Sequence, residues 1–141
     1  MRVLGLDVGD RRIGVALSDA LGVTAQPLTV MTRGGLTQDL NAICALAAQH
    51  QAEAIVVGLP LTMRGEQGPQ AKKVMAFAEA LRRRLSISVQ FIDERLTTVQ
   101  GERALLETDT PRRRRKQLID QVAAQLILQQ FLDVHARSRH E

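Results

Sequence analysis

Short runs of apolar residues, each broken by turn-forming residues, mark the first third of the chain. Gly9 and Arg11 bound one turn, and a second turn containing Gly22 follows the next run. Such spacing is typical of β-hairpins. Proline cannot donate a hydrogen bond to a neighbouring strand, so Pro27 indicates an edge position for the last of these runs. The pattern predicts three strands, at residues 3–7, 13–17 and 23–30.

From residue 36 onwards, segments with a helical period alternate with short apolar runs. Apolar residues three or four positions apart predict helices, and the runs between them predict buried strands. The helices are expected at 36–50, from Val74 to Leu85, from Thr97 to about Thr108, and at 113–134; the strands are expected at 54–57 and 87–92. Residues 61–69 are expected to form a mobile loop and residues 136–141 a frayed tail.

This order of elements predicts an α/β fold with a single domain at residues 1–135. Strands 1 to 3 are expected to be antiparallel, and right-handed crossovers make strands 1, 4 and 5 parallel. The result is a five-stranded mixed sheet with helices on both faces. A chain of 141 residues suits one such domain.

Charge and composition narrow the function. Nineteen Lys and Arg residues against 15 acidic ones give a net charge of +4 and a pI near 10.2. Two clusters, 82–84 and 112–116, favour a polyanion such as nucleic acid, although each cluster alone could be a solvated helix face. With three phenylalanines as the only Phe, Tyr or Trp residues, base stacking is disfavoured and backbone contacts are favoured.

The chain carries no sequence pattern for export or membrane insertion. Its single cysteine, Cys44, excludes an internal disulfide, and no apolar run approaches the length that a bilayer requires. We therefore expect a cytoplasmic protein with no membrane partner.

Three acidic residues stand at the ends of apolar segments. Asp7 and Glu94 follow predicted strands, and Asp120 begins an apolar helical stripe that includes Ala123 and Ala124. Carboxylates beside an apolar layer are costly unless they are paired or hold a cation. The sequence therefore predicts a divalent-metal site. The alternatives are a turn-capping role for Asp7, a charge pair with Arg95 after the fifth strand, and a Lys116 pair for Asp120.

Residues 7–16 also have the form D-x-G-x-x-x-x-G-x-A, which marks the wide superfamily of ribonuclease H, actin and hexokinase. Gly9 would let backbone amides approach a phosphate, and Gly14 would let another element pack closely on the second strand. No G-x-x-x-x-G-K-[ST] loop occurs, which disfavours a P-loop nucleotidase.

Four motifs together resemble the YqgF/RuvX family. They are LDVGDRRIGVA at 6–16, VVGLPL at 56–61, DERLTT at 93–98 and DQVAAQLIL at 120–128. The resemblance implies a ribonuclease H-like fold, kinship with the RuvC Holliday-junction resolvases, and a nuclease that matures the 5′ end of pre-16S ribosomal RNA or resolves Holliday junctions. It also implies that Asp7, Glu94 and Asp120 are the acidic triad. RuvC-type enzymes carry an acid after the fourth strand, where this chain has Gly58-Leu59-Pro60.

We expect hydrolysis of phosphodiester bonds assisted by two Mg²⁺ or Mn²⁺ ions, since both ions prefer carboxylate oxygens. Asp7 would bridge the ions, and Glu94 and Asp120 would each hold one. Branched DNA or precursor rRNA is the expected partner, and a homodimer would suit a substrate with two strands to cut. The residues expected to bind nucleic acid are Arg11, Arg12, Arg64, Arg95, Arg112, Arg113, Arg114, Arg115 and Lys116.

Two other function classes stay open at this stage. One is a non-catalytic nucleic-acid-binding factor for ribosome assembly, in which the acids are relics. The other is a nucleotide-binding phosphotransferase, which ranks last because actin- and hexokinase-like proteins enclose their cleft with two such domains.

Overall fold

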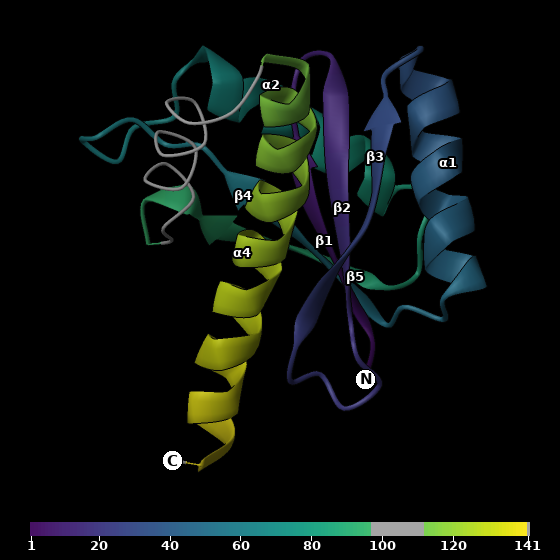
Figure 1. The fold of residues 1–141 in the computed structure, drawn as a ribbon, viewed down its shortest axis with the longest axis vertical. Coiled ribbons are helices and arrows are strands. Elements are labelled where there is room, and N and C mark those ends of the chain that lie inside the picture. Colours follow the sequence, from purple (N-terminus) through teal and green to yellow (C-terminus); the bar gives the residue numbers. More distant parts are fainter. Residues whose placement is uncertain (97–111, 141) are drawn as a thin grey trace.

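Five strands form one mixed sheet in the order β3-β2-β1-β4-β5 (Figure 1). The structure, a computed structural model, describes the backbone of residues 1–96 and 112–140 and the side chains of 1–95 and 119–136. The strands are β1 (Val3–Val8), β2 (Arg12–Ser18), β3 (Ala25–Thr32), β4 (Ala54–Leu59) and β5 (Ser88–Asp93). The first three are antiparallel, whereas β1, β4 and β5 run parallel. The predicted fold class is confirmed.

Helices cover both faces of the sheet. On one face lie α1 (Leu36–Gln49) and α2 (Pro69–Arg82), whose buried residues pack against Leu4, Leu6 and Val8 of β1. On the other face lies α4 (Arg112–His140), which crosses the sheet obliquely (Figure 1). The strands therefore alternate between two apolar layers, as the period of two along a strand requires. A short 3₁₀ helix, η1 (Glu94–Leu96), follows β5 directly.

Most element boundaries lie within two residues of the prediction, and two helices are longer than expected. The helix α2 begins at Pro69, five residues before the apolar stripe, because proline is well suited to the first position of a helix. The helix α4 continues to His140, so residues 136–140 are helical in this structure, and fraying of this tail stays a prediction. No glycine or proline follows Pro111 to end the helix. The helix predicted from Thr97 lies outside the described residues.

Both edges of the sheet carry a feature that interferes with strand pairing. Pro27 lies in β3, the edge strand that its presence predicted. At the opposite edge, the guanidinium of Arg82 donates from Nε to the carbonyl oxygen of Val89 in β5 at 3.0 Å and stacks over the ring of Phe91 at 5.2 Å. Arg82 therefore has a structural role rather than the purely solvated or nucleic-acid-facing one that its cluster suggested.

Among the helices in the described ranges, none combines the length and the apolar composition needed to cross a membrane.

Candidate active site

Asp7 lies near the end of β1, on the face that α4 covers. Val3, Gly5 and Asp7 alternate along that face, as the period of the strand predicts, and Asp7 is 8% exposed. Its neighbour across the sheet in β2 is Gly14, which has no side chain to crowd the carboxylate. Asp7 therefore lies in a gap between the sheet and the helix, at the end of the strand where α/β proteins commonly bind ligands.

Two glycines let α4 approach the sheet closely. A Cβ at Gly5 would lie 2.7 Å from Cβ of Leu128, and one at Gly14 would overlap the carbonyl oxygen of Asp120. Ala123 and Ala124 of the helix are fully buried at this contact. The backbone of Asp120 is thus seated directly on β2, where the close packing predicted for Gly14 takes place.

Glu94 reaches the same region from β5. It is the first residue of η1 and is only 3% exposed. A Cβ at Gly58 would lie 2.8 Å from Oε1 of Glu94, so the carboxylate of Glu94 occupies the space above β4 that a side chain at position 58 would otherwise fill. No acid follows β4 in the sequence, but Glu94, which follows β5, places its carboxylate above β4.

The three predicted carboxylates line one pocket. Its volume is about 330 Å³, and it lies between the ends of β1 and β4 and the start of the described side chains in α4. Its lining residues are Asp7, Val8, Gly9, Pro60, Gln70, Glu94, Ile119 and Asp120. The strand β1, the 3₁₀ turn η1 and the helix α4 contribute one acid each.

The oxygen donors suit a hard divalent cation such as Mg²⁺ or Mn²⁺. In the part of the chain that the structure describes, however, no group of three or more His, Cys, Asp or Glu side chains is arranged to hold a metal ion. The residue types therefore fit the ion, although the carboxylates are not gathered around one point in this structure.

Arg12 is bound to Asp120, a contact that sequence reasoning missed. Its Nε lies 2.6 Å from Oδ2 of Asp120, and the side chains are 32% and 17% exposed. The sequence suggests a Lys116 pair for Asp120 and a nucleic-acid contact for Arg12. The signal that could have revealed this pair is alternation in β2, which puts Arg12, Gly14 and Ala16 on the face beneath α4.

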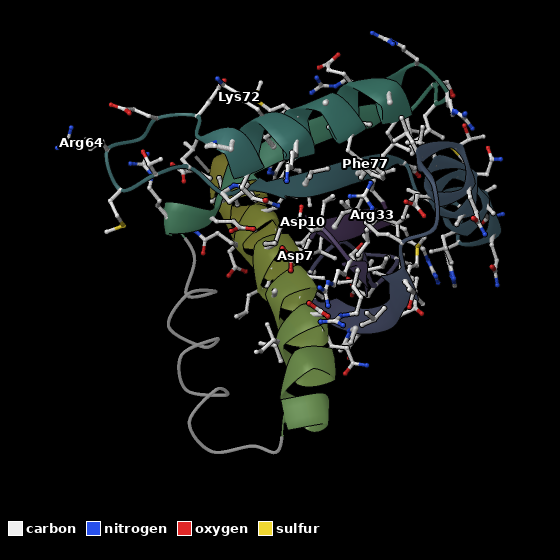
Figure 2. The ribbon with its side chains drawn as sticks, turned by 90° about the horizontal axis from the view of Figure 1, so that it is seen from above. Asp7, Asp10, Arg33, Arg64, Lys72 and Phe77 are labelled. Atoms are coloured by element: carbon white, nitrogen blue, oxygen red, sulfur yellow. The ribbon has the colours of Figure 1, made fainter. Side chains whose placement is uncertain are left out.

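A second arginine, also missed, anchors the hairpin wall of the pocket. Arg33 donates from Nε to Oδ2 of Asp39 at 3.1 Å and from Nη1 to the carbonyl oxygen of Gly9 at 3.1 Å. Its guanidinium stacks over Phe77 of α2 at 5.2 Å, and Asp39 is 3% exposed (Figure 2). This ion pair ties the β1–β2 turn to both helices of that face.

The structure places only some of the remaining basic residues that the sequence predicted to bind nucleic acid. Arg11 is exposed in the β1–β2 turn, and Arg64 lies at the tip of the 61–69 loop, directed away from Asp7 (Figure 2). A backbone hydrogen bond from Thr62 to Glu66 closes that loop on itself, and the mobility expected of residues 61–69 stays a prediction. The side chains of 112–116 lie outside the described residues.

Arg95 forms an ion pair with Asp93 at the end of β5. Its Nη2 lies 2.7 Å from Oδ2 of Asp93, and these hydrogen bonds lower the pKa of the Asp93 carboxyl while Asp93 raises the pKa of Arg95. The charge pair considered for this strand end therefore forms with Asp93, and Glu94 is left to face the pocket.

Comparison with known proteins decides the family. The family described as "RuvX: Holliday junction resolvase" matches residues 1–134. The chain belongs to the RuvX family. Two RuvX relatives, whose names describe them as candidate pre-16S rRNA nucleases, come from Moorella thermoacetica and Myxococcus xanthus. The first is 56% identical over 94% of this chain and 95% of its own length, and the second is 50% identical over 96% and 89%.

Solved structures place this RuvX chain in the fold of the RuvC resolvases. The RuvC of T. thermophilus, solved in complex with a Holliday junction substrate, superposes with a TM-score of 0.60 at 14% identity, covering 96% of both chains. The fowlpox virus Holliday junction resolvase superposes with a TM-score of 0.56 at 9% identity, covering 95% of this chain and 99% of its own. At such identities the similarity concerns the fold.

Proposed function

We propose that this RuvX protein is a divalent-metal-dependent endonuclease that hydrolyses phosphodiester bonds in structured nucleic acid. Asp7, Glu94 and Asp120 are its catalytic and metal-binding carboxylates. The observation that carries the proposal is that these acids, from three separate elements, line one pocket. Membership of the RuvX family, with relatives named as candidate pre-16S rRNA nucleases, supports the reaction class.

Electrostatics explain why such a pocket requires a cation. Two of its carboxylates are less than a tenth exposed, and a phosphodiester is itself an anion. Without a positive charge between them, the acids would repel the substrate more strongly than the same groups in water, because burial weakens screening. When bound, Mg²⁺ or Mn²⁺ supplies that charge, polarises the phosphoryl group and lowers the pKa of a coordinated water.

The protein's own residues fix the geometry. The sheet holds Asp7, Gly14 holds α4 against β2, and Gly58 leaves space for Glu94. In the proposal, Arg11, Arg12, Arg64 and Arg95 contact phosphates on either side of the cut, together with Lys116 and Arg112–Arg115 at the start of α4. Affinity for nucleic acid should then fall steeply as salt is raised.

Two substrates follow from the names of the relatives and the family: the 5′ leader of precursor 16S rRNA and the four-way DNA junction. Purified protein should be incubated with each of them, with Mg²⁺ and with Mn²⁺, and the products resolved by length. The substrate that is cut, and the position of the cut, identify the biological reaction. Binding of either substrate without cleavage under all four conditions would favour the non-catalytic assembly factor.

Asp7→Asn provides the decisive variant. It removes a charge from the metal site with almost no change of shape, so cleavage should fall by at least about a hundredfold, as for loss of a key electrostatic group. Binding of the substrate should be largely retained. The matched control is Asp10→Asn, three residues away, where the acid is exposed and, among the described side chains, pairs with Lys73 at 3.4 Å. Cleavage by Asp7→Asn at the wild-type rate would remove Asp7 from the mechanism.

A further inference from the structure

The carboxylate of Asp120 is engaged by a cationic side chain of the same protein. Nε of Arg12 lies 2.6 Å from Oδ2, a short charge-assisted hydrogen bond. The pair joins residues 108 positions apart in the sequence, and the two side chains are partly exposed, at 32% for Arg12 and 17% for Asp120. The third acid of the candidate metal site is thus already paired with a guanidinium.

Arg12 and Glu94 lie in opposite directions across the sheet from the strand that carries Asp7. Arg12 belongs to β2, whereas the carboxylate of Glu94 lies above Gly58 in β4, and β1 with Asp7 runs between these strands. Adjacent strands are about 4.8 Å apart, so β2 and β4 are separated by roughly 10 Å. Arg12 holds Asp120 from the side remote from Glu94. This agrees with the observation that, in the described residues, the acids are not yet arranged to hold a metal ion.

We propose that Arg12 and a divalent cation compete for Asp120, and that cation binding releases Arg12 to contact a phosphate of the nucleic acid. This rests on the proposed function, in which Asp120 is a metal ligand. To share a cation with Asp7 and Glu94, Asp120 would have to give up its ion pair with Arg12. Arg12 then presents an unneutralised guanidinium beside the pocket.

Competition of this kind couples the two ligands. A phosphate that draws Arg12 away frees Asp120 for the cation, and a cation that takes Asp120 frees Arg12 for the phosphate. Because such coupling is reciprocal, each ligand should raise the affinity for the other by the same factor. Arg12 is therefore a positioning residue. Without nucleic acid it holds Asp120 away from the other two acids, and when a phosphate binds Arg12, Asp120 is released to the cation.

Binding of Mn²⁺ to the protein without nucleic acid tests the competition directly. Free Mn²⁺ is followed by electron paramagnetic resonance during titration of the wild type, Arg12→Gln, Asp120→Asn and the double variant. Arg12→Gln should bind Mn²⁺ about two- to tenfold more tightly, the range expected from losing a partly exposed ion pair. Asp120→Asn should bind more weakly, and the double variant should bind no more tightly than Asp120→Asn. Arg83→Gln, which removes one exposed positive charge at the end of α2, should leave the affinity unchanged.

Binding of a labelled four-way junction, followed by fluorescence anisotropy before cleavage proceeds, tests the second half. Mn²⁺ should raise the junction affinity of the wild type, and Arg12→Gln should lose most of this increase. If Arg12→Gln melts more than a few degrees below the wild type, Arg12→Lys replaces it, with a smaller change of the same sign, because lysine keeps the charge and loses the fork geometry.

Weaker or unchanged Mn²⁺ binding by Arg12→Gln would overturn the competition and leave Arg12 as a residue that orients Asp120. Failure of the wild type to bind Mn²⁺ at millimolar concentration would instead overturn the metal requirement in the proposed function. The first result is read from the Arg12→Gln variant and the second from the wild type, so the two failures are distinguishable.

Discussion

Replacing Gly14 by alanine introduces a single methyl group where α4 touches the sheet. The new Cβ would overlap the carbonyl oxygen of Asp120 and lie 3.0 Å from its carbonyl carbon, with Cβ of Ala124 at 3.4 Å. Two of these atoms belong to the helix backbone, so no side-chain rotation relieves the clash. The helix has to withdraw from β2 by roughly 1 Å, which forfeits up to half of the dispersion energy at each contact that opens.

The cost follows from how much of α4 is buried. Its apolar side chains form the core of one face of the sheet, where Ile127 and Leu128 are fully buried. Overpacking of a tight core contact typically costs up to about 3 kcal/mol, and we expect the upper end of that range because backbone atoms are involved. For a domain of this size, about 3 °C per kcal/mol translates this into a fall of roughly 10 °C in Tm.

Urea unfolding monitored by circular dichroism at 222 nm measures the free energy of unfolding. The matched control is Gly35→Ala before α1, since a Cβ there meets nothing within 4 Å; its stability should change by less than about 1 kcal/mol. An unfolding free energy for Gly14→Ala within 1 kcal/mol of the wild type, at an unchanged slope in urea, would refute the reasoning that this glycine sets the distance between helix and sheet.

Two further predictions concern the end of the sheet that carries the pocket. Gly58→Ala should reduce cleavage far more than it reduces stability, because the methyl group meets side chains, Cδ1 of Ile127 at 2.5 Å and Oε1 of Glu94 at 2.8 Å, rather than backbone, and displaces the Glu94 carboxylate. Comparing the cleavage rate with the stability in urea checks this. Asp93→Asn should be less stable than the wild type only above about pH 4. Hydrogen bonds from Arg95 lower the pKa of the Asp93 carboxyl below its ordinary value of 3.8. The ion pair therefore stabilises the wild type at higher pH and is lost as the carboxyl is protonated. Equal stability of the variant and the wild type at pH 7 would refute this.

Apolar patterns predicted the strands and helices, and hairpin spacing with right-handed crossovers predicted the strand directions and the helices on both faces. Asp7 and Asp120 could be placed for the same reason, since alternation and the helical stripe determine which way each points. Their convergence with Glu94 is a hypothesis at the level of the sequence, and in the structure all three acids line one pocket.

Contacts that depend on three-dimensional register could not be predicted as readily. The pairing of Arg12 with Asp120 and of Arg33 with Asp39 depends on how far a long side chain extends and on where a loop turns. Alternation in β2 puts Arg12 on the face beneath α4, but it does not say which acid of the helix lies within reach there. The same limitation applies to Gly58, whose importance is visible only once Glu94 is seen above it.

The obstructed borders of the sheet restrict how copies of this protein can associate. A proline in β3 and the guanidinium of Arg82 on the carbonyl of Val89 in β5 both discourage an additional strand from joining. Ribbon-like polymerisation is therefore disfavoured even when the protein is concentrated along a long nucleic acid. If two copies act together on a branched substrate, helices rather than strands are left to make the contact between them.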